Sequence, residues 1–316
     1  MAGVIALAGC GSSSSGGGGG SNQPQSGGNT ALCGGQTGSG NVKIAAFNFS
    51  ESETLANIYA AALDKCGYHA TVKAVGAREV VYPALKKGDF AAVPEYAATL
   101  TDFINQQANG PNAPTKASGE IATTMTNLRA ELPSNLVALQ PAAATDKNAF
   151  AIKSSLAQSA NISTMSQLAA YSKTHPVSLA GPAECPTRPF CEPGLKQTYG
   201  MKISKFVNLG SDAGGPLTLK ALTSGKATVG LVFTSDPTPA SKGLTVLQDD
   251  KNLQASDNIV PIVQKTYATG AFAHALNAVD SKLSQAALIG LNKAVELQRA
   301  PIQAVATGFL QTVGLG

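Results

Sequence analysis

The chain has 316 residues and a formal net charge of +4, with 43% hydrophobic and 13% charged residues. This length suggests two domains or two lobes. The apolar content is sufficient for folded cores, and the charge is too low for a disordered chain. No run of lysine and arginine occurs, so we expect no nucleic-acid partner.

The N-terminus predicts a lipid anchor. Residues 1–10, MAGVIALAGC, form a short apolar stretch that ends in Leu7-Ala8-Gly9-Cys10. This ending resembles a bacterial lipobox, in which the cysteine is lipidated and the preceding residues are removed. Because the basic opening of a signal peptide is missing, we interpret 1–10 as a signal-peptide remnant. The alternative is a small apolar stretch that ends in Cys10 by chance; it is too short to span a bilayer.

Residues 11–40 are rich in glycine and serine. Such sequences behave as flexible coil. Directly after a lipidated cysteine, this segment would tether the folded protein to the outer face of the cell membrane. We therefore expect an extracytoplasmic, lipid-anchored protein.

The five cysteines fit the same compartment. If Cys10 carries lipid, four remain. Cys185 and Cys191 bracket the loop CPTRPFC and can close on each other, and Cys33 would then pair with Cys66. Disulfides belong outside the cytosol. A metal site is the alternative, but neither CxxC nor HxxxH spacing occurs, so we expect no metal and no cofactor.

The first third of the chain predicts a β-α-β-α-β unit, which implies a parallel sheet covered by helices on both faces. Ser50 and Glu53 have the spacing of a capping box at the first helix. The second helix is expected to turn Val80, Val81, Ala84 and Leu85 inward. The expected elements are, in order, strand 42–47, helix 50–66, strand 70–75, helix 78–87 and strand 90–93, where Pro94 breaks the run.

After a helical region over 97–131, the α/β pattern restarts near residue 148. This second unit predicts strands at 148–152, 177–179, 205–208 and 229–233, and helices at 165–173, 193–200 and 216–224. The remainder, 234–316, predicts one strand at 259–263 and helices at 282–298 and 301–311.

Two stretches repeat each other. ALKKGDFAAVPEY, residues 84–96, aligns with ALTSGKATVGLVF, residues 221–233, so that Tyr96 falls on Phe233. In open parallel sheets, ligands bind beyond the carboxyl ends of the strands. We therefore expect Tyr96 and Phe233 to face one shared cleft between two lobes; the alternative is that each aromatic ring only plugs its own lobe.

Four stretches, in this order, resemble the osmoprotectant-binding proteins of ABC importers, the glycine betaine/carnitine/choline family: NFSESETLANIYAAAL, AREVVYPALKKGDFAAVPEYAATL, AGPAECPTRPFCEPGLKQTYG and LVFTSD. The resemblance implies an α/β, type II periplasmic-binding-protein fold, with two α/β lobes joined by two crossover strands near 143–150 and 233–237. Lobe one would comprise 41–147 and 235–316, and lobe two 148–234.

The resemblance also implies a function. The protein would be a monomeric solute-binding lipoprotein that captures a quaternary ammonium compound, such as glycine betaine, choline or carnitine, and hands it to an ABC permease. The alternative is the same fold with another small solute, such as an amino acid or polyamine. An enzyme is disfavoured because GxSxG, HExxH and Walker A motifs are missing. A purely structural or adhesive lipoprotein is a third possibility.

A trimethylammonium group cannot donate hydrogen bonds and is recognised by aromatic faces. The resemblance places Tyr96, the tyrosine of the PEYAAT motif that ends in Thr99, in an aromatic cage. Phe233 stands where relatives usually have tyrosine, and Phe49 and Phe190 are further candidates.

A betaine carboxylate would need donors. Candidates are Ser50 at a helix N-terminus and the guanidinium groups of Arg188 or Arg78. Asp236 is a candidate to face the cation, and Asn148 to bind ligand. Each has a purely structural alternative: Ser50 as a helix cap, Arg78 paired with Glu79, Arg188 bracing its loop, Asp236 capping a turn and Asn148 fixing the hinge.

Overall fold

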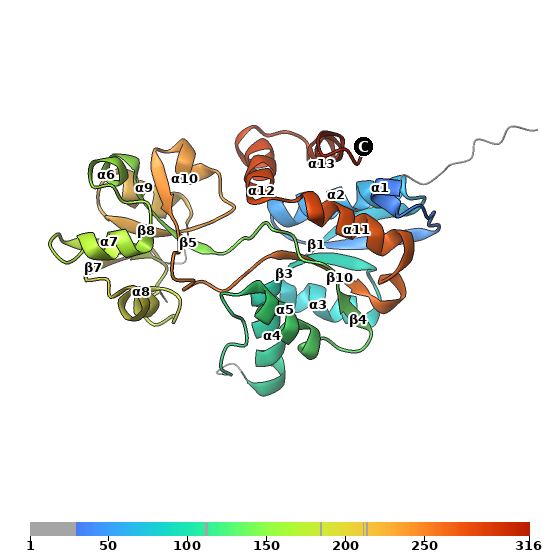
Figure 1. Cartoon of the computed structure of the whole chain (residues 1–316), viewed down its shortest axis with the longest axis horizontal. Helices are drawn as coiled ribbons and strands as arrows, with labels where there is room; N and C mark the ends of the chain where they lie inside the picture. Colours follow the sequence, from blue (N-terminus) through green and yellow to red (C-terminus); the bar gives the residue numbers. More distant parts are fainter. Residues whose placement is uncertain (1–29, 111–112, 184, 211, 213) are drawn as a thin grey trace, which may run out of the picture.

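The computed structural model describes residues 30–316 except 111, 112, 184, 211 and 213. The lipobox with Cys10 lies outside the described residues, as does most of the expected tether. Figure 1 shows two lobes side by side, joined by extended segments. Among the described helices, none combines the length and the hydropathy needed to cross a bilayer.

The first lobe contains a five-stranded sheet with the order β2-β1-β3-β10-β4. Strands β1, β2 and β3 are parallel, whereas β10 runs antiparallel to both neighbours. The strands are β1 (Asn41–Phe47), β2 (His69–Gly76), β3 (Ala92–Tyr96), β4 (Leu136–Ala138) and β10 (Ile259–Gln264). The main helices are α1 (Thr30–Cys33), α2 (Ser50–Lys65), α3 (Arg78–Lys87), α4 (Ala97–Asn109), α5 (Ile121–Glu131), α11 (Gly270–Lys282), α12 (Gln285–Asn292) and α13 (Ile302–Thr312), with a π-helical segment at Lys293–Leu297.

The second lobe repeats this topology in the order β7-β6-β8-β5-β9. Here β6 is parallel to β7 and β8, and β5 runs antiparallel to β8 and β9. Its strands are β5 (Asn148–Lys153), β6 (Val177–Gly181), β7 (Ile203–Asn208), β8 (Val229–Phe233) and β9 (Leu244–Leu247). Its helices are α6 (Ser154–Ser159), α7 (Met165–Tyr171), α8 (Glu192–Tyr199), α9 (Pro216–Thr223) and α10 (Thr238–Ser241).

Strand β3 extends beyond its expected end. Pro94 lies inside β3, opposite Pro261 of β10. The N–H of Ala97 donates to the Asn258 carbonyl, and bonded and non-bonded pairs alternate along an antiparallel ladder. The two prolines therefore face each other at a non-bonded pair, where their missing N–H groups leave no bond between β3 and β10 unmade. This register carries the strand through to Tyr96.

Two local predictions in the first lobe were wrong. Val80 is 53% exposed, whereas Val81 and Leu85 are buried as expected. Phe49, not Ser50, is the N-cap of α2, and no capping box forms. The Ser50 hydroxyl instead donates to Glu296 of the π-helical segment, which removes it from the cap.

The connections between the lobes differ from expectation at one point. The first crossing, near residues 142–147, lies antiparallel to a second crossing that ends in β10; Ile259 N–H donates to the Ala144 carbonyl and Asp146 N–H to that of Asp257. The second crossing had been expected at 233–237, with 235–316 in lobe one. Strand β9 pairs with β5, however, because its apolar residues extend the second sheet, so the chain crosses back only after β9.

Both expected disulfides are present, Cys33–Cys66 and Cys185–Cys191. The first fixes α1 to the end of α2. Leu32 and Cys33 are fully buried, and α1 packs against α11. Residues 30–33 are therefore helical and belong to the folded lobe, whereas the sequence had placed them in the flexible tether.

Candidate functional site

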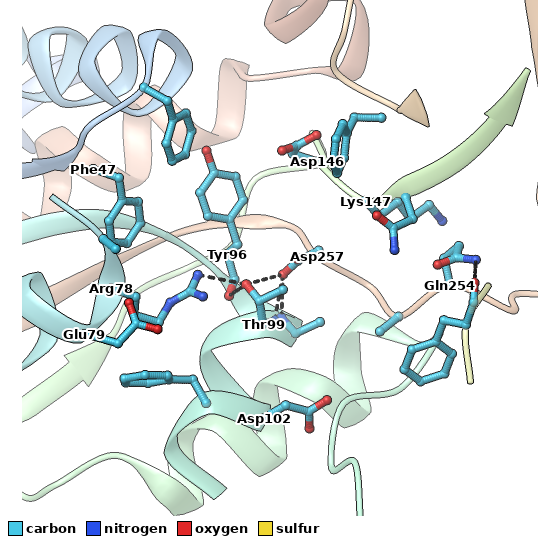
Figure 2. A pocket seen from close by; sticks show the side chains of 18 of the residues that line it. Phe47, Arg78, Glu79, Tyr96, Thr99, Asp102, Asp146, Lys147, Gln254 and Asp257 are labelled. Carbon is cyan, nitrogen blue, oxygen red and sulfur yellow. Dashed lines mark hydrogen bonds between the residues drawn. The ribbon is translucent and has the colours of Figure 1, made fainter. Parts of the chain in front are cut away.

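A cavity of about 840 Å³ lies between the two lobes. The first lobe contributes the end of β1, the turn before α3, the end of β3 and the start of α4. The second lobe contributes the start of β5, the loop closed by the Cys185–Cys191 disulfide and the end of β8. The two crossings form part of its wall through Asp146 and Asp257 (Figure 2).

Tyr96 and Phe233 are the last residues of β3 and β8, which occupy equivalent positions in the two sheets. Both line this cavity. The structure therefore brings the two aromatic residues together as the repeat predicted. It places five other candidates in the same wall: Phe49, Arg78, Thr99, Asn148 and Phe190.

Three aromatic rings form a cluster on the first-lobe side. The ring centroids of Phe47 and Phe49 lie 5.9 Å apart, those of Phe49 and Tyr96 6.1 Å, and those of Phe47 and Tyr96 6.4 Å. Phe103, Phe190 and Phe233 also line the cavity. Phe49 is 43% exposed, so its apolar ring is available to a ligand.

The Tyr96 ring is held in a fixed orientation. Its hydroxyl donates to Glu51 Oε1 at 2.7 Å, and Tyr96 is 5% exposed. Burial, followed by the nearby charge of Glu51, raises the pKa of Tyr96 well above its usual value. The phenol therefore stays protonated and remains a donor to Glu51.

Arg78 is paired within the first lobe. Its Nε donates to both Glu95 carboxylate oxygens at 3.0 and 3.2 Å, and Nη2 donates to Glu95 Oε2 at 2.9 Å. Nη2 also donates to Thr99 Oγ1 at 2.8 Å, and the guanidinium carbon lies 5.4 Å from the centre of the Phe47 ring. Burial alone would lower the pKa of Arg78, but the Glu95 charge raises it. The pairing with Glu79 considered from the sequence is replaced by this bidentate contact.

Asp146 and Asp257, which lie on the two crossings, have raised pKa values. Asp257 accepts from the N–H groups of Ala98 and Thr99 at 2.9 and 3.0 Å, yet burial raises its pKa to about 7. Asp146 accepts from the Ser235 hydroxyl at 2.6 Å. Burial, followed by the charge of Glu51, raises the pKa of Asp146 to about 7. Asp257 thus occupies the start of α4, where a ligand carboxylate would otherwise find free amides.

Three predicted residues lie outside the lining of this cavity in the described part of the chain. Ser50 is bonded to Glu296. Asp236 accepts from the Thr238 N–H at 2.7 Å, which is the turn-capping role considered from the sequence. Arg188 belongs to the disulfide loop, where its carbonyl accepts from the Cys191 N–H.

Sequence reasoning missed other lining residues, including Phe47, Phe103, Lys147 and Gln254. Phe47 ends β1 and could have been found by the strand-end argument that selected Tyr96. Gln254 Nε2 donates to the Phe190 carbonyl at 2.7 Å, a contact between distant segments that no local pattern encodes. Figure 2 shows Lys147 and Gln254 across the cavity from Arg78.

Comparison with known proteins agrees with this architecture. A family model described as the substrate binding domain of ABC-type glycine betaine transport systems matches residues 40–312. Comparison with curated protein sequences gives no match.

Solved structures share the fold over most of the chain. Apo YehZ from Escherichia coli has a TM-score of 0.74 and 21% identity, covering 87% of this chain and 99% of its own. A glycine betaine/carnitine/choline ABC transporter structure has a TM-score of 0.72 and 18% identity, with coverage of 87% and 99%. Lactococcal OpuAC, closed on glycine betaine, has a TM-score of 0.52 and 15% identity, with coverage of 86% and 95%. The expected type II periplasmic-binding-protein fold is confirmed.

Proposed function

Because the chain belongs to the family of substrate-binding domains of ABC-type glycine betaine transport systems, we propose that it captures a quaternary-ammonium osmolyte in the interlobe cavity. Proteins of this family bind small solutes outside the cytoplasm and work with an ABC permease; they are not enzymes. In this proposal the ligand is glycine betaine, choline, carnitine or a similar compound, and the loaded protein delivers it to the permease.

The aromatic lining of the cavity is the observation that carries the proposal. A trimethylammonium group gains about 0.5–2 kcal/mol from each aromatic face that it contacts. The clustered rings of Phe47, Phe49 and Tyr96 lie on one lobe, and Phe190 and Phe233 on the other. A cation between them would contact faces from both lobes, which links binding to closure.

The charges of the lining favour a cation. The carboxyl groups of Glu79, Asp102, Asp146 and Asp257 line the cavity, against Arg78 and Lys147. Asp146 and Asp257, with pKa values of about 7, are only partly ionised at neutral pH. Arg78 is already bound by Glu95. Lys147 is thus the better candidate to meet a ligand carboxylate, if the ligand has one, and it replaces the arginine clamp expected from the sequence.

We also propose that Cys10 carries the lipid that anchors the protein. Four of the five cysteines form the two disulfides, and Cys10 ends the lipobox-like stretch. Expression in a bacterial host should give a product that partitions into detergent, and Cys10→Ala should move it to the aqueous phase. Equal partitioning of the wild type and the variant would contradict lipidation of Cys10.

A thermal-shift screen tests which class of ligand the protein binds. The panel contains glycine betaine, choline, carnitine, amino acids and polyamines. The chain has no tryptophan, so a dye or calorimetry must report unfolding. A ligand at about 1,000 times its Kd adds about 4 kcal/mol of stability, which moves Tm by several degrees.

The outcomes separate the candidates. A shift confined to quaternary amines supports the proposal. A shift only with amino acids or polyamines keeps the binding function and overturns the ligand class. No shift with any compound contradicts capture of these solutes.

A further inference from the structure

The second crossing contains a short segment, residues 249–256, that is bonded to both lobes. On the second-lobe side, Asp249 Oδ1 accepts from the N–H of Leu253 at 3.0 Å, and Oδ2 accepts from that of Gln254 at 2.7 Å. The Tyr199 hydroxyl, at the end of α8, also donates to Asp249. The segment is therefore held in a fixed position against α8.

The same segment is bonded to the first lobe. The Asn252 side chain donates to Glu120 Oε1 at 3.2 Å, and the Ser256 N–H donates to the Ser118 carbonyl at 2.7 Å. Gly119 approaches so closely that an added Cβ would lie 2.8 Å from the Asn252 Cβ. The backbone of the segment is thus restrained by both lobes.

Gln254 lies within this segment and connects it to the aromatic wall of the interlobe cavity. Gln254 lines the cavity and is 4% exposed. Its Nε2 donates to the Phe190 carbonyl at 2.7 Å (Figure 2). Because a buried amide has lost its hydration, breaking this hydrogen bond would leave a donor without a partner, which is costly.

Phe190 belongs to the loop that the Cys185–Cys191 disulfide closes. A hydrogen bond within the loop, from the Cys191 N–H to the Arg188 carbonyl, contributes to its shape. The hydrogen bond from Gln254 comes from outside the loop. It therefore fixes where the loop lies relative to the crossing.

Close packing supports this placement. Gly194 of α8 lies between the disulfide loop and the segment. An added Cβ on Gly194 would lie 2.4 Å from the Pro189 carbonyl oxygen and 2.5 Å from Leu253 Cδ1. There is no room for a larger side chain at this position, so the loop and the crossing pack closely together next to Phe190.

We propose that Gln254 is a positioning residue of the interlobe site, which holds the Phe190 carbonyl and thereby fixes the Phe190 ring in the cavity wall. This inference rests on the proposed function, in which Phe190 supplies an aromatic face of the second lobe. Because the segment is also bonded to the first lobe, the position of this ring depends on the crossing as well as on the disulfide loop.

The first test needs no ligand. The chain has no tryptophan, so Phe190→Trp introduces a single tryptophan fluorophore at this position. Gln254→Met keeps the length of the side chain and removes its donor. In the Phe190→Trp background it should increase acrylamide quenching of the fluorophore and decrease its fluorescence anisotropy. If Gln254→Met does not fold, Gln254→Asn replaces it, because its shorter side chain no longer reaches the carbonyl.

Gln248→Met is the matched control for the fluorescence test. Gln248 is exposed and stands outside the described lining of the cavity, so this variant should leave quenching and anisotropy unchanged. Equal quenching in Gln254→Met and in the control would overturn the proposal.

The second test measures affinity for the quaternary amine that gives the largest thermal shift. Gln254→Met should weaken binding by about threefold to tenfold. When Phe190→Ala is already present, the further loss should be less than about twofold, because the two residues act through one contact. Equal losses in both backgrounds would mean that Gln254 acts on the ligand directly, and would overturn the positioning role. If no quaternary amine binds, the proposed function fails, and the fluorescence test alone decides whether Gln254 positions Phe190.

Discussion

At the scale of single residues, the site depends on side chains whose polar ends are already bound. The Tyr96 hydroxyl donates a hydrogen bond to Glu51, and the Arg78 guanidinium donates to Glu95 and Thr99. Because these polar atoms already have partners, the two side chains offer a ligand few free hydrogen-bonding groups. They contribute the Tyr96 ring and a fixed geometry. This favours a ligand with an apolar cationic surface.

Substitution of Tyr96 separates the ring from the hydroxyl. Tyr96→Ala should weaken quaternary-amine binding by about tenfold, because an aromatic face contributes about 0.5–2 kcal/mol and about 1.4 kcal/mol corresponds to a factor of ten. Tyr96→Phe keeps the ring and should bind within about threefold of wild type, while losing about 1–2 kcal/mol of stability because Glu51 Oε1 loses its donor. Calorimetric titration and urea unfolding measure the two effects. Unchanged affinity in Tyr96→Ala would remove this residue from the site.

The Arg78–Glu95 pair makes a stability prediction. Glu95 is 1% exposed, and Glu95→Gln leaves the Arg78 charge poorly compensated beside Phe47. We expect the free energy of unfolding to fall by about 3 kcal/mol, in the range seen when one member of a buried pair is removed. The exposed neighbour Glu79 supplies the control, since Glu79→Gln should change stability by at most about 0.5 kcal/mol. Equal urea midpoints for the two variants would contradict a structural role for the pair.

At the scale of elements, the crossings between lobes carry ionisable groups. Asp146 and Asp257 lie on adjacent antiparallel segments, with Asp146 N–H donating to the Asp257 carbonyl. Glu51, whose pKa is raised by burial, approaches them from the start of α2. Such groups hold protons in the folded state that they release on unfolding.

The stability of the unliganded protein should therefore fall as pH rises from 5 to 8. The pKa values of Asp146 and Asp257 are near 7 when folded and 3.8 as free groups. Between these values the folded state binds more protons, so the free energy of unfolding decreases with pH. Asp146→Asn should lessen the fall in Tm by several degrees, whereas Glu79→Gln should leave it as in wild type. A Tm that is flat or rises across this range would contradict the prediction.

At the scale of the whole molecule, the two lobes share one strand order and meet through two adjacent crossings. Aromatic residues of the cavity come from both lobes, so we expect a cation that contacts both to favour their approach. Closure then stabilises the liganded form by contacts that the open form lacks.

Small-angle X-ray scattering tests this closure. Saturation with the quaternary amine that gives the largest thermal shift should decrease the radius of gyration. Tyr96→Ala at the same ligand concentration serves as the weak-binding control and should show less compaction. A radius unaffected by saturating ligand would mean that binding occurs without lobe movement.

Features that depend on neighbouring residues were predicted from the sequence, whereas features that depend on contacts between distant segments were not. The strand Val229–Phe233 was predicted to the residue because its apolar run is local. The second crossing was misplaced because the pairing of Leu244–Leu247 with β5 is a contact between distant segments. Ser50 and Arg78 were assigned local partners, Glu53 and Glu79, whereas the fold supplies Glu296 and Glu95 from elsewhere. Helix α11 was missed entirely, although its buried residues Phe272, Leu276 and Val279 have helical spacing.

The Cys33–Cys66 disulfide determines how the folded protein bears a mechanical load. A pull applied at Thr30 reaches Cys33 and passes through the covalent bond to Cys66, bypassing β1 and α2. The 33-residue separation between the cysteines corresponds to roughly 110 Å of extended chain that tension cannot draw out. While the disulfide is intact, a force applied at Thr30 does not pass through β1, so it does not displace the end of that strand, Phe47, which lines the interlobe cavity.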